Sequence, residues 1–196
     1  MARIYTKGGD KGRTSLLSGQ RVSKCNQYVD AYGVVDELQA QIGVLIATCH
    51  DQRMTGLLKK IQADLHTAMA QLALGHSPNQ GRLAKLIRQD DVAWLESEID
   101  RYVDIFPLPK RYVVPGASLD SAQAHVARTV CRRAERKITA LPEGAALQML
   151  LKYFNRLSDL LFTLAWGMEL MALAKEALGI NPEVKGDTYE YAPLHS

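Results

Sequence analysis

The chain has 196 residues, and its 24 lysines and arginines exceed its 21 acidic residues to give a net charge of +3. This length suits one domain with a sizeable core. With 47% apolar and 23% charged residues, the composition excludes a disordered chain, and a charge of +3 is too small to favour a nucleic-acid partner. Three cysteines without a CxxC pair fit a reducing compartment and predict no metal site. No signal peptide or uninterrupted apolar span is visible, so we expect a cytoplasmic protein that binds neither nucleic acid nor membrane.

Residues 1–24 differ from the rest of the chain because they are rich in glycine, basic residues and hydroxyls and show no helical or alternating period. We predict an ordered loop with a short extended start at Ile4 and Tyr5. Glycines expose backbone N–H groups, and together with lysines they suit a polyphosphate. The spacing matches neither a Walker A loop nor a dinucleotide fingerprint. A flexible terminus remains the alternative interpretation.

Five helices are predicted after this loop. Apolar residues repeat every three or four positions from about Asn26, again over 57–72, and then from a cap at Asp90 or Asp91 as far as Phe106. A fourth helix starts at Ser118 or Asp120 and runs to about residue 141, with an expected core face of Val126, Val130, Ala134 and Ile138. The fifth, over about 143–178, is apolar nearly all round and is expected at the centre.

The predicted fold is therefore all-α: a five-helix bundle with a four-helix, up-and-down type core. We expect one domain over 1–196, made of the N-terminal loop 1–24, the bundle 25–178 and a coil tail 179–196.

The fourth predicted helix carries a charged face. Arg128, Arg132, Glu135 and Arg136 fall on one side of it at about 100° per residue. Neighbouring guanidinium groups repel one another unless an anion lies among them, and their geometry suits phosphate. A solvated basic face is the alternative.

The fifth predicted helix carries two polar residues, Asn155 and Asp159, on an otherwise apolar surface. Polar groups buried there need partners, and the arginines of the preceding helix are the nearest donors. Two facing polar stripes indicate a binding site, although a purely structural network would use the same residues. Cys131 is interpreted as a packed thiol.

Four segments together resemble the PduO-type ATP:cob(I)alamin adenosyltransferases, also called corrinoid adenosyltransferases. They are IYTKGGDKG at 4–12 with RVSK at 21–24, AYGVVDEL at 31–38, RTVCRRAER at 128–136, and YFNRLSD at 153–159. The resemblance implies a homotrimer with active sites at subunit interfaces, MgATP as co-substrate and cob(I)alamin as the substrate that receives the 5′-deoxyadenosyl group. It also implies a corrinoid reductase and an adenosylcobalamin-dependent enzyme as partners.

The resemblance also implies roles for single residues. For ATP these are Thr6, Lys7, Gly8, Gly9, Thr14, Ser15, Lys24, Arg132, Arg133, Glu135, Arg136 and Asn155. Asp36 and Arg128 match a carboxylate–guanidinium pair between subunits, and we assign them with Arg132 to catalysis. Tyr112 falls where the family commonly has a phenylalanine beneath the corrin ring.

The chain departs from the family pattern at Gly8, where a second threonine is usual, and at Ala117, where a glycine is usual. These departures leave a second hypothesis open, an ATP- or corrinoid-binding bundle without turnover. A purely structural bundle is the third.

Overall fold

The computed structural model describes Tyr5 and residues 7–49, 51–75, 83–110, 112–142 and 144–179. Its elements are the strands β1 (Arg13–Ser15) and β2 (Arg21–Ser23) and the helices α1 (Gln27–Thr48), α2 (Gln52–Ala73), α3 (Gln89–Ile105), α4 (Leu119–Thr139) and α5 (Ala145–Ala177). The five predicted helices are thus confirmed. The expected extended residue Ile4 and the tail from residue 180 lie outside the described residues.

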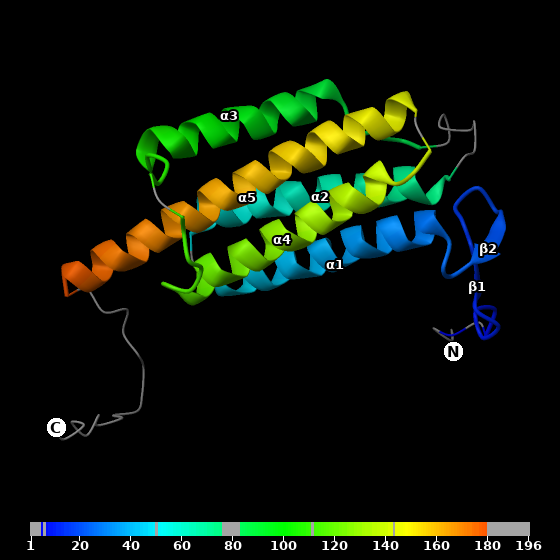
Figure 1. Ribbon diagram of the computed structural model, residues 1–196, viewed down its shortest axis with the longest axis horizontal. Helices are drawn as coiled ribbons and strands as arrows, with labels where there is room; N and C mark the ends of the chain where they lie inside the picture. The colour runs from blue at the N-terminus through cyan, green and yellow to red at the C-terminus, as the bar shows by residue number, and fades with distance from the viewer. Residues whose placement is uncertain are drawn as a thin grey trace, which may run out of the picture.

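The helices lie side by side along the long axis, with the small hairpin at one end beside the start of α1 (Figure 1). Helix α1 packs against α2 and α4, and α5 packs against α3 and α4. Helices α1, α2, α4 and α5 therefore form the predicted four-helix core, with α3 along the outer side of α5.

Side-chain caps set the starts of three helices. Asn26, Asp51 and Ser118 each accept a hydrogen bond from a backbone N–H in the first turn. The predicted cap of α3 at Asp90 or Asp91 is wrong. Arg88 is the N-cap, and the Asp91 carboxylate accepts from the Arg88 N–H at 3.0 Å, so the aspartate acts from within the helix.

The hairpin was not predicted. Strands β1 and β2 pair antiparallel with Thr14 opposite Val22, and three-residue strands are too short to show a period. The buried Leu16 side chain and a hydrogen bond from the Leu17 N–H to the Ala73 carbonyl (2.7 Å) attach the hairpin to the end of α2. Gly75, at φ +61°, leaves room for Leu16, since a Cβ there would lie 2.8 Å from its Cδ1.

The core face of α4 differs at one predicted position. Val130, Ala134 and Ile138 are buried as expected, but Val126 is 45% exposed. The helix instead buries a row of small side chains, Ala124, Ala127, Cys131 and Ala134. Cys131 is the packed thiol that was predicted, and its Sγ donates to the Phe154 carbonyl at 3.3 Å.

Helix α5 is long and apolar enough over residues 146–177 to cross a membrane by length and composition, contrary to the sequence prediction. Its described residues between Leu150 and Met168 are largely buried against the other helices, as in the core helix of a bundle. Beyond Met171 it is exposed.

A buried polar network joins α2 to α5. Asp64 is fully buried, and its carboxylate accepts from Lys60 Nζ (2.6 Å), Lys85 Nζ (3.1 Å) and the Tyr153 hydroxyl (3.1 Å). Burial, followed by the charge of Asp64, raises the pKa of Tyr153 well above its usual range. The phenol therefore stays protonated and serves as a donor.

We predict that Asp64→Ala lowers the free energy of unfolding by about 2–3 kcal/mol, because it leaves the Tyr153 hydroxyl buried without its acceptor and opens a cavity. Tyr153→Phe removes only one of three donors and should cost about 1 kcal/mol. Urea denaturation at a fixed protein concentration measures both. The exposed Asp104→Ala is the control and should change the value by less than about 0.5 kcal/mol; an Asp64→Ala loss no larger than this would contradict the proposed role of the network.

Candidate functional site

The polar stripes of α4 and α5 meet where these helices pack together. Asn155 Nδ2 donates to Glu135 Oε1 at 3.2 Å, and Arg156 Nη1 donates to Asn155 Oδ1 at 2.7 Å. The predicted contact of the two stripes is present, but the α4 partner of Asn155 is Glu135 and not an arginine. Both functional groups of the Asn155 amide are thereby held in a fixed orientation.

Asp159 lies one turn further along α5. Burial raises its pKa, while the positive charges of Arg156 and Arg132 oppose that shift. The carboxyl group is thus in the electric field of two guanidinium groups from two helices. The side chain is nevertheless exposed, and no ion pair joins it to an α4 arginine among the described residues, so the predicted buried partnership is not formed.

The cations of α4 divide into two sets. Arg133 forms an ion pair with Glu37 of α1, and Lys137 pairs with Asp30 of α1 at 2.7 Å. Arg132 and Arg136 are exposed, and neither forms an ion pair with any residue that the structure describes. Arg133, predicted for ATP, is therefore held by α1, whereas Arg132 and Arg136 are available for an anion.

The N-terminal loop is ordered from Lys7 by its own backbone. Arg21 Nη2 donates to the Gly8 carbonyl at 2.8 Å, and the Lys24 N–H donates to the Gly12 carbonyl at 2.8 Å. The Lys24 side chain folds over Gly9, where a Cβ would lie 3.1 Å from Nζ. Glycine at position 9 therefore allows an ammonium group to lie against the loop backbone.

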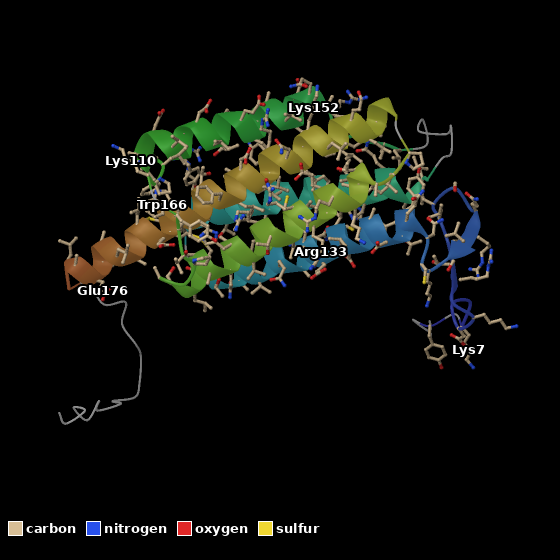
Figure 2. The ribbon with its side chains drawn as sticks, in the orientation of Figure 1. Lys7, Lys110, Arg133, Lys152, Trp166 and Glu176 are labelled. Atoms are coloured by element: carbon tan, nitrogen blue, oxygen red, sulfur yellow. The ribbon has the colours of Figure 1, made fainter. Side chains whose placement is uncertain are left out.

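The threonine and serine side chains of this loop that were predicted to contact ATP differ in their exposure. Thr14 is half-buried in β1, and Ser15 is exposed, with its Oγ 3.4 Å from Arg21 Nη1. Thr6 lies outside the described residues. Figure 2 shows Lys7 beyond the end of the bundle and well apart from Arg133 on α4. Among the described residues, no hydrogen bond or ion pair joins this loop to Arg132 or Arg136, although Lys137 of α4 pairs with Asp30 near the start of α1.

Asp36 and Arg128 do not pair within the chain. The Glu37–Arg133 ion pair sets the register of α1 against α4, and it separates the levels of Asp36 and Arg128 by about 9 Å along the bundle at 1.5 Å per residue. Asp36 is exposed on α1, and the Arg128 Nε donates to His125 Nδ1 at 3.4 Å. Asp36 is thus exposed on α1, whereas Arg128 is half-buried and in contact with His125 of its own helix.

The opposite end of the bundle, where α3 and α5 end and α4 begins, exposes large apolar side chains. They are Ile105, Leu108, Tyr112, Val114, Leu119, Met171, Leu173 and Leu178. Tyr112 is 91% exposed. The segment before it is held against α5 by a hydrogen bond from the Trp166 indole N–H to the Pro107 carbonyl at 2.9 Å.

A groove of about 360 Å³ lies between α3 and α5 next to this end. Its lining residues are Glu96, Ile99, Asp100, Val103, Leu108, Arg156, Asp159, Phe162 and Thr163. The Arg156 Nε donates to Glu96 Oε1 at 2.9 Å across its rim. Apart from Asp159, none of these residues was predicted for the site. The sequence signal for the groove is limited to two acidic residues of α3, Glu96 and Asp100, whose spacing of four places them on one helix face.

No cluster of three or more potential metal-binding side chains occurs in the part of the chain that the structure describes. The site so far consists of organic cations, an amide, carboxylates and an apolar groove. Such a set is suited to binding an anion and a large, partly apolar molecule, and to orienting them.

Known proteins are similar to this chain in sequence. The family model for cobalamin adenosyltransferase matches residues 4–168. A corrinoid adenosyltransferase of Citrobacter freundii is 42% identical over 168 residues, covering 84% of this chain and 94% of that protein. One from Mycobacterium tuberculosis strain H37Rv is 42% identical over 170 residues, covering 84% of this chain and 88% of its own length.

Solved structures agree with the sequence comparisons. A variant of the PduO-type ATP:corrinoid adenosyltransferase of Lactobacillus reuteri, complexed with cobalamin and ATP, superposes with a TM-score of 0.79 at 33% identity, over 87% of this chain and 93% of that one. A second variant of that enzyme, complexed with ATP, gives a TM-score of 0.77 at 32% identity, over 87% of this chain and 96% of that one.

The fold and the site therefore define an adenosyltransferase of the helical-bundle type. The chain belongs to the cobalamin adenosyltransferase family. This confirms the resemblance drawn from the four sequence segments.

Proposed function

We propose that the chain transfers the 5′-deoxyadenosyl group of ATP to the cobalt of a reduced corrinoid such as cob(I)alamin and releases triphosphate. Family membership supports this reaction. The observation in this chain that carries the proposal is the pair of arginines without ion-pair partners among the described residues, Arg132 and Arg136, beside the fixed Asn155 amide. Such a set provides guanidinium donors for phosphate oxygens and an oriented amide for the rest of a nucleotide.

ATP binds, in this proposal, between the glycine-rich loop of one subunit and the α4–α5 seam of a neighbour. The loop contributes Lys24 over Gly9, with Lys7, Gly8, Thr14, Ser15 and Thr6 alongside. The seam contributes Arg132, Arg136, Glu135 and Asn155. Arg133 does not contact ATP in this proposal; its ion pair with Glu37 fixes α4 against α1 and so positions the neighbouring arginines.

The subunits associate as a homotrimer in this proposal, because no hydrogen bond or ion pair among the described residues joins the loop of a chain to its own α4–α5 seam. A face of α1 offers small residues for close helix packing: Gly33, Ala40 and Gly43 lie with Asp36 along a shallow groove. On α4, the half-buried Arg128 lies near the exposed Val126. Pairing of these two different faces is heterologous, and such interfaces close into rings.

The corrinoid occupies the apolar end of the bundle in this proposal, with Tyr112 against one face of the ring and the α3–α5 groove beside it. Two observations support the assignment. Exposed apolar side chains gather there, and a patch of that kind marks a binding surface. Arg156, which lines the groove, also donates to Asn155 Oδ1 at 2.7 Å, so the groove adjoins the nucleotide seam.

The residues then act by placement and charge. Cobalt(I) is the nucleophile: its electron pair forms the Co–C5′ bond as the C5′–O bond breaks, and the electrons leave on triphosphate. Arg132, Arg136 and Lys24, with the Mg²⁺ that accompanies ATP, stabilise the charge on the departing oxygen. The remaining requirement is alignment of C5′ with cobalt in a site closed to water.

The reaction is tested with cob(I)alamin and MgATP under strict reduction, followed by visible absorption. The proposal predicts conversion to the spectrum of an alkylated cobalt(III) corrinoid and release of one triphosphate per corrinoid. Tight binding of ATP and corrinoid by calorimetry without this change would identify a binding bundle without turnover. Binding of neither would leave only a structural role.

Lys24→Ala should raise the KM for ATP about tenfold, because one charge-assisted contact to phosphate is lost. The KM for the corrinoid should change little, since that substrate is assigned to the other end of the bundle. Lys11→Ala removes a cation from the same loop and is the matched control. Equal ATP KM values for the two variants would contradict the role given to Lys24.

A charge swap tests the subunit pairing. Asp36→Arg should shift the sedimenting species from trimer towards monomer, because it places a second cation against Arg128. Combining it with Arg128→Asp restores opposite charges and should recover the trimer. Asp30→Arg, which alters an ion pair within the chain, is the control. A trimer unaffected by Asp36→Arg would place the interface elsewhere.

A further inference from the structure

A second polar cluster lies inside the α4–α5 seam, towards the apolar end of the bundle. His125 and Glu169 are both buried, at 4% and 8% exposure. The Glu169 carboxylate accepts from the Ser121 hydroxyl at 3.2 Å. The His125 ring stands edge to face with Phe162, with centroids 6.1 Å apart, and Phe162 lines the α3–α5 groove.

The hydrogen bond to Arg128 defines the state of the His125 ring. A guanidinium group only donates, so His125 Nδ1, 3.4 Å from Arg128 Nε, must accept. The ring is therefore neutral and carries its proton on Nε2. That Nε2 is buried without a hydrogen-bond partner among the described residues.

The unpartnered Nε2–H argues against a purely structural histidine. For packing against Phe162 alone, an apolar ring would serve better, because a buried donor without an acceptor costs stability. The feature that an apolar ring lacks is the Nδ1 acceptor for Arg128. The contact with Arg128 is therefore the role that only a histidine ring, and not an apolar ring, fills at this position.

We propose that His125 is a positioning residue for the adenosyl transfer: its neutral ring holds Arg128 in the orientation that the corrinoid side of the site requires. This inference rests on the proposed function, which places Arg128 at the subunit interface and the corrinoid at the end of the bundle where α4 begins. His125 contacts Phe162 on one side and Arg128 on the other. It thus links the wall of the groove to the residue that meets the neighbouring subunit.

Protonation of His125 would abolish this arrangement, because an imidazolium cannot accept at Nδ1 and repels the guanidinium. Burial, and then the charge of Arg128, lower the pKa of His125 below its usual value of 6.5, whereas Glu169 of α5 opposes the shift. On the other side of α4, the part of α1 nearest to His125 along the bundle contributes the Thr48 hydroxyl. This hydroxyl is uncharged and donates to Gln123. The orienting contact is therefore complete above pH 6.5 and is lost as the pH falls through the lowered pKa of the histidine.

The experiment compares His125→Asn with His125→Phe in the wild-type background. The Asn side-chain oxygen occupies nearly the position of Nδ1 and accepts without titrating, while Phe keeps the ring and removes the acceptor. We expect His125→Phe to raise the corrinoid KM at least tenfold at pH 8, with the ATP KM within twofold of wild type. His125→Asn should lose less than threefold and should show no decline in corrinoid kcat/KM as the pH falls below 6.5, where the wild type declines.

His66→Asn, on the exposed face of α2, is the control and should keep the wild-type decline. Equal corrinoid KM values for His125→Asn and His125→Phe would overturn the proposal, as would an unchanged acid decline in His125→Asn. If His125→Phe does not fold, the pH comparison between wild type and His125→Asn decides alone. Absence of turnover in the wild type at pH 8 would overturn the proposed function and this inference with it. If the wild type turns over normally but the corrinoid KM values of His125→Asn and His125→Phe are equal, only the inference is overturned.

Discussion

The close packing of α4 against α5 is the constraint on which the rest of the structure depends. Helix α4 buries alanines and a cysteine against α5, all of them fully buried, and side chains this small let the two backbones approach closely. The polar residues that flank this row are consequently brought into contact along one edge. Glu135 meets Asn155 near one end of that edge, and Ser121 meets Glu169 near the other. Larger core residues on α4 would separate these pairs and with them the two halves of the proposed site.

The cations of α4 have two different roles, which depend on the direction in which each side chain points. Those directed towards α1 find carboxylates at Glu37 and Asp30 and contribute to the packing of the bundle. Exposed ion pairs of this kind contribute little stability, about 0–1 kcal/mol each, so their main effect is to define register and rotation. Once Arg133 is directed to α1, the helical period turns Arg132 about 100° and Arg136 about 60° away from it around the helix axis. Their availability for a nucleotide is thus a geometric consequence of how α4 sits on α1.

The sequence predicted those parts of the structure that depend on local periodicity and capping. The buried face of α2, the start of α1 near Asn26, the start of α4 at one of the two predicted positions, Ser118, and the meeting of the α4 and α5 stripes follow from spacing alone. The exposure of Val126 was missed because α4 buries small residues, and a pattern search favours large ones. The hairpin, the Arg133–Glu37 pair and the α3–α5 groove depend on contacts between segments far apart in the chain. Hydrophobic patterns carry no information on such contacts, so they required the structure.

The distribution of charge in a single chain also explains why this chemistry calls for association. A strongly reducing cobalt centre and a departing triphosphate both require a site from which water is excluded. Yet Arg132, Arg136, Asp36 and the loop around Lys7 all face outward, and the loop extends beyond the bundle (Figure 2). Burying these groups within one chain would leave unpaired charges in a low-dielectric interior at a cost of several kcal/mol each. Leaving them exposed lets the monomer fold without that cost, and in the homotrimer that we propose the charges are desolvated only when a neighbouring subunit and the substrates supply their partners.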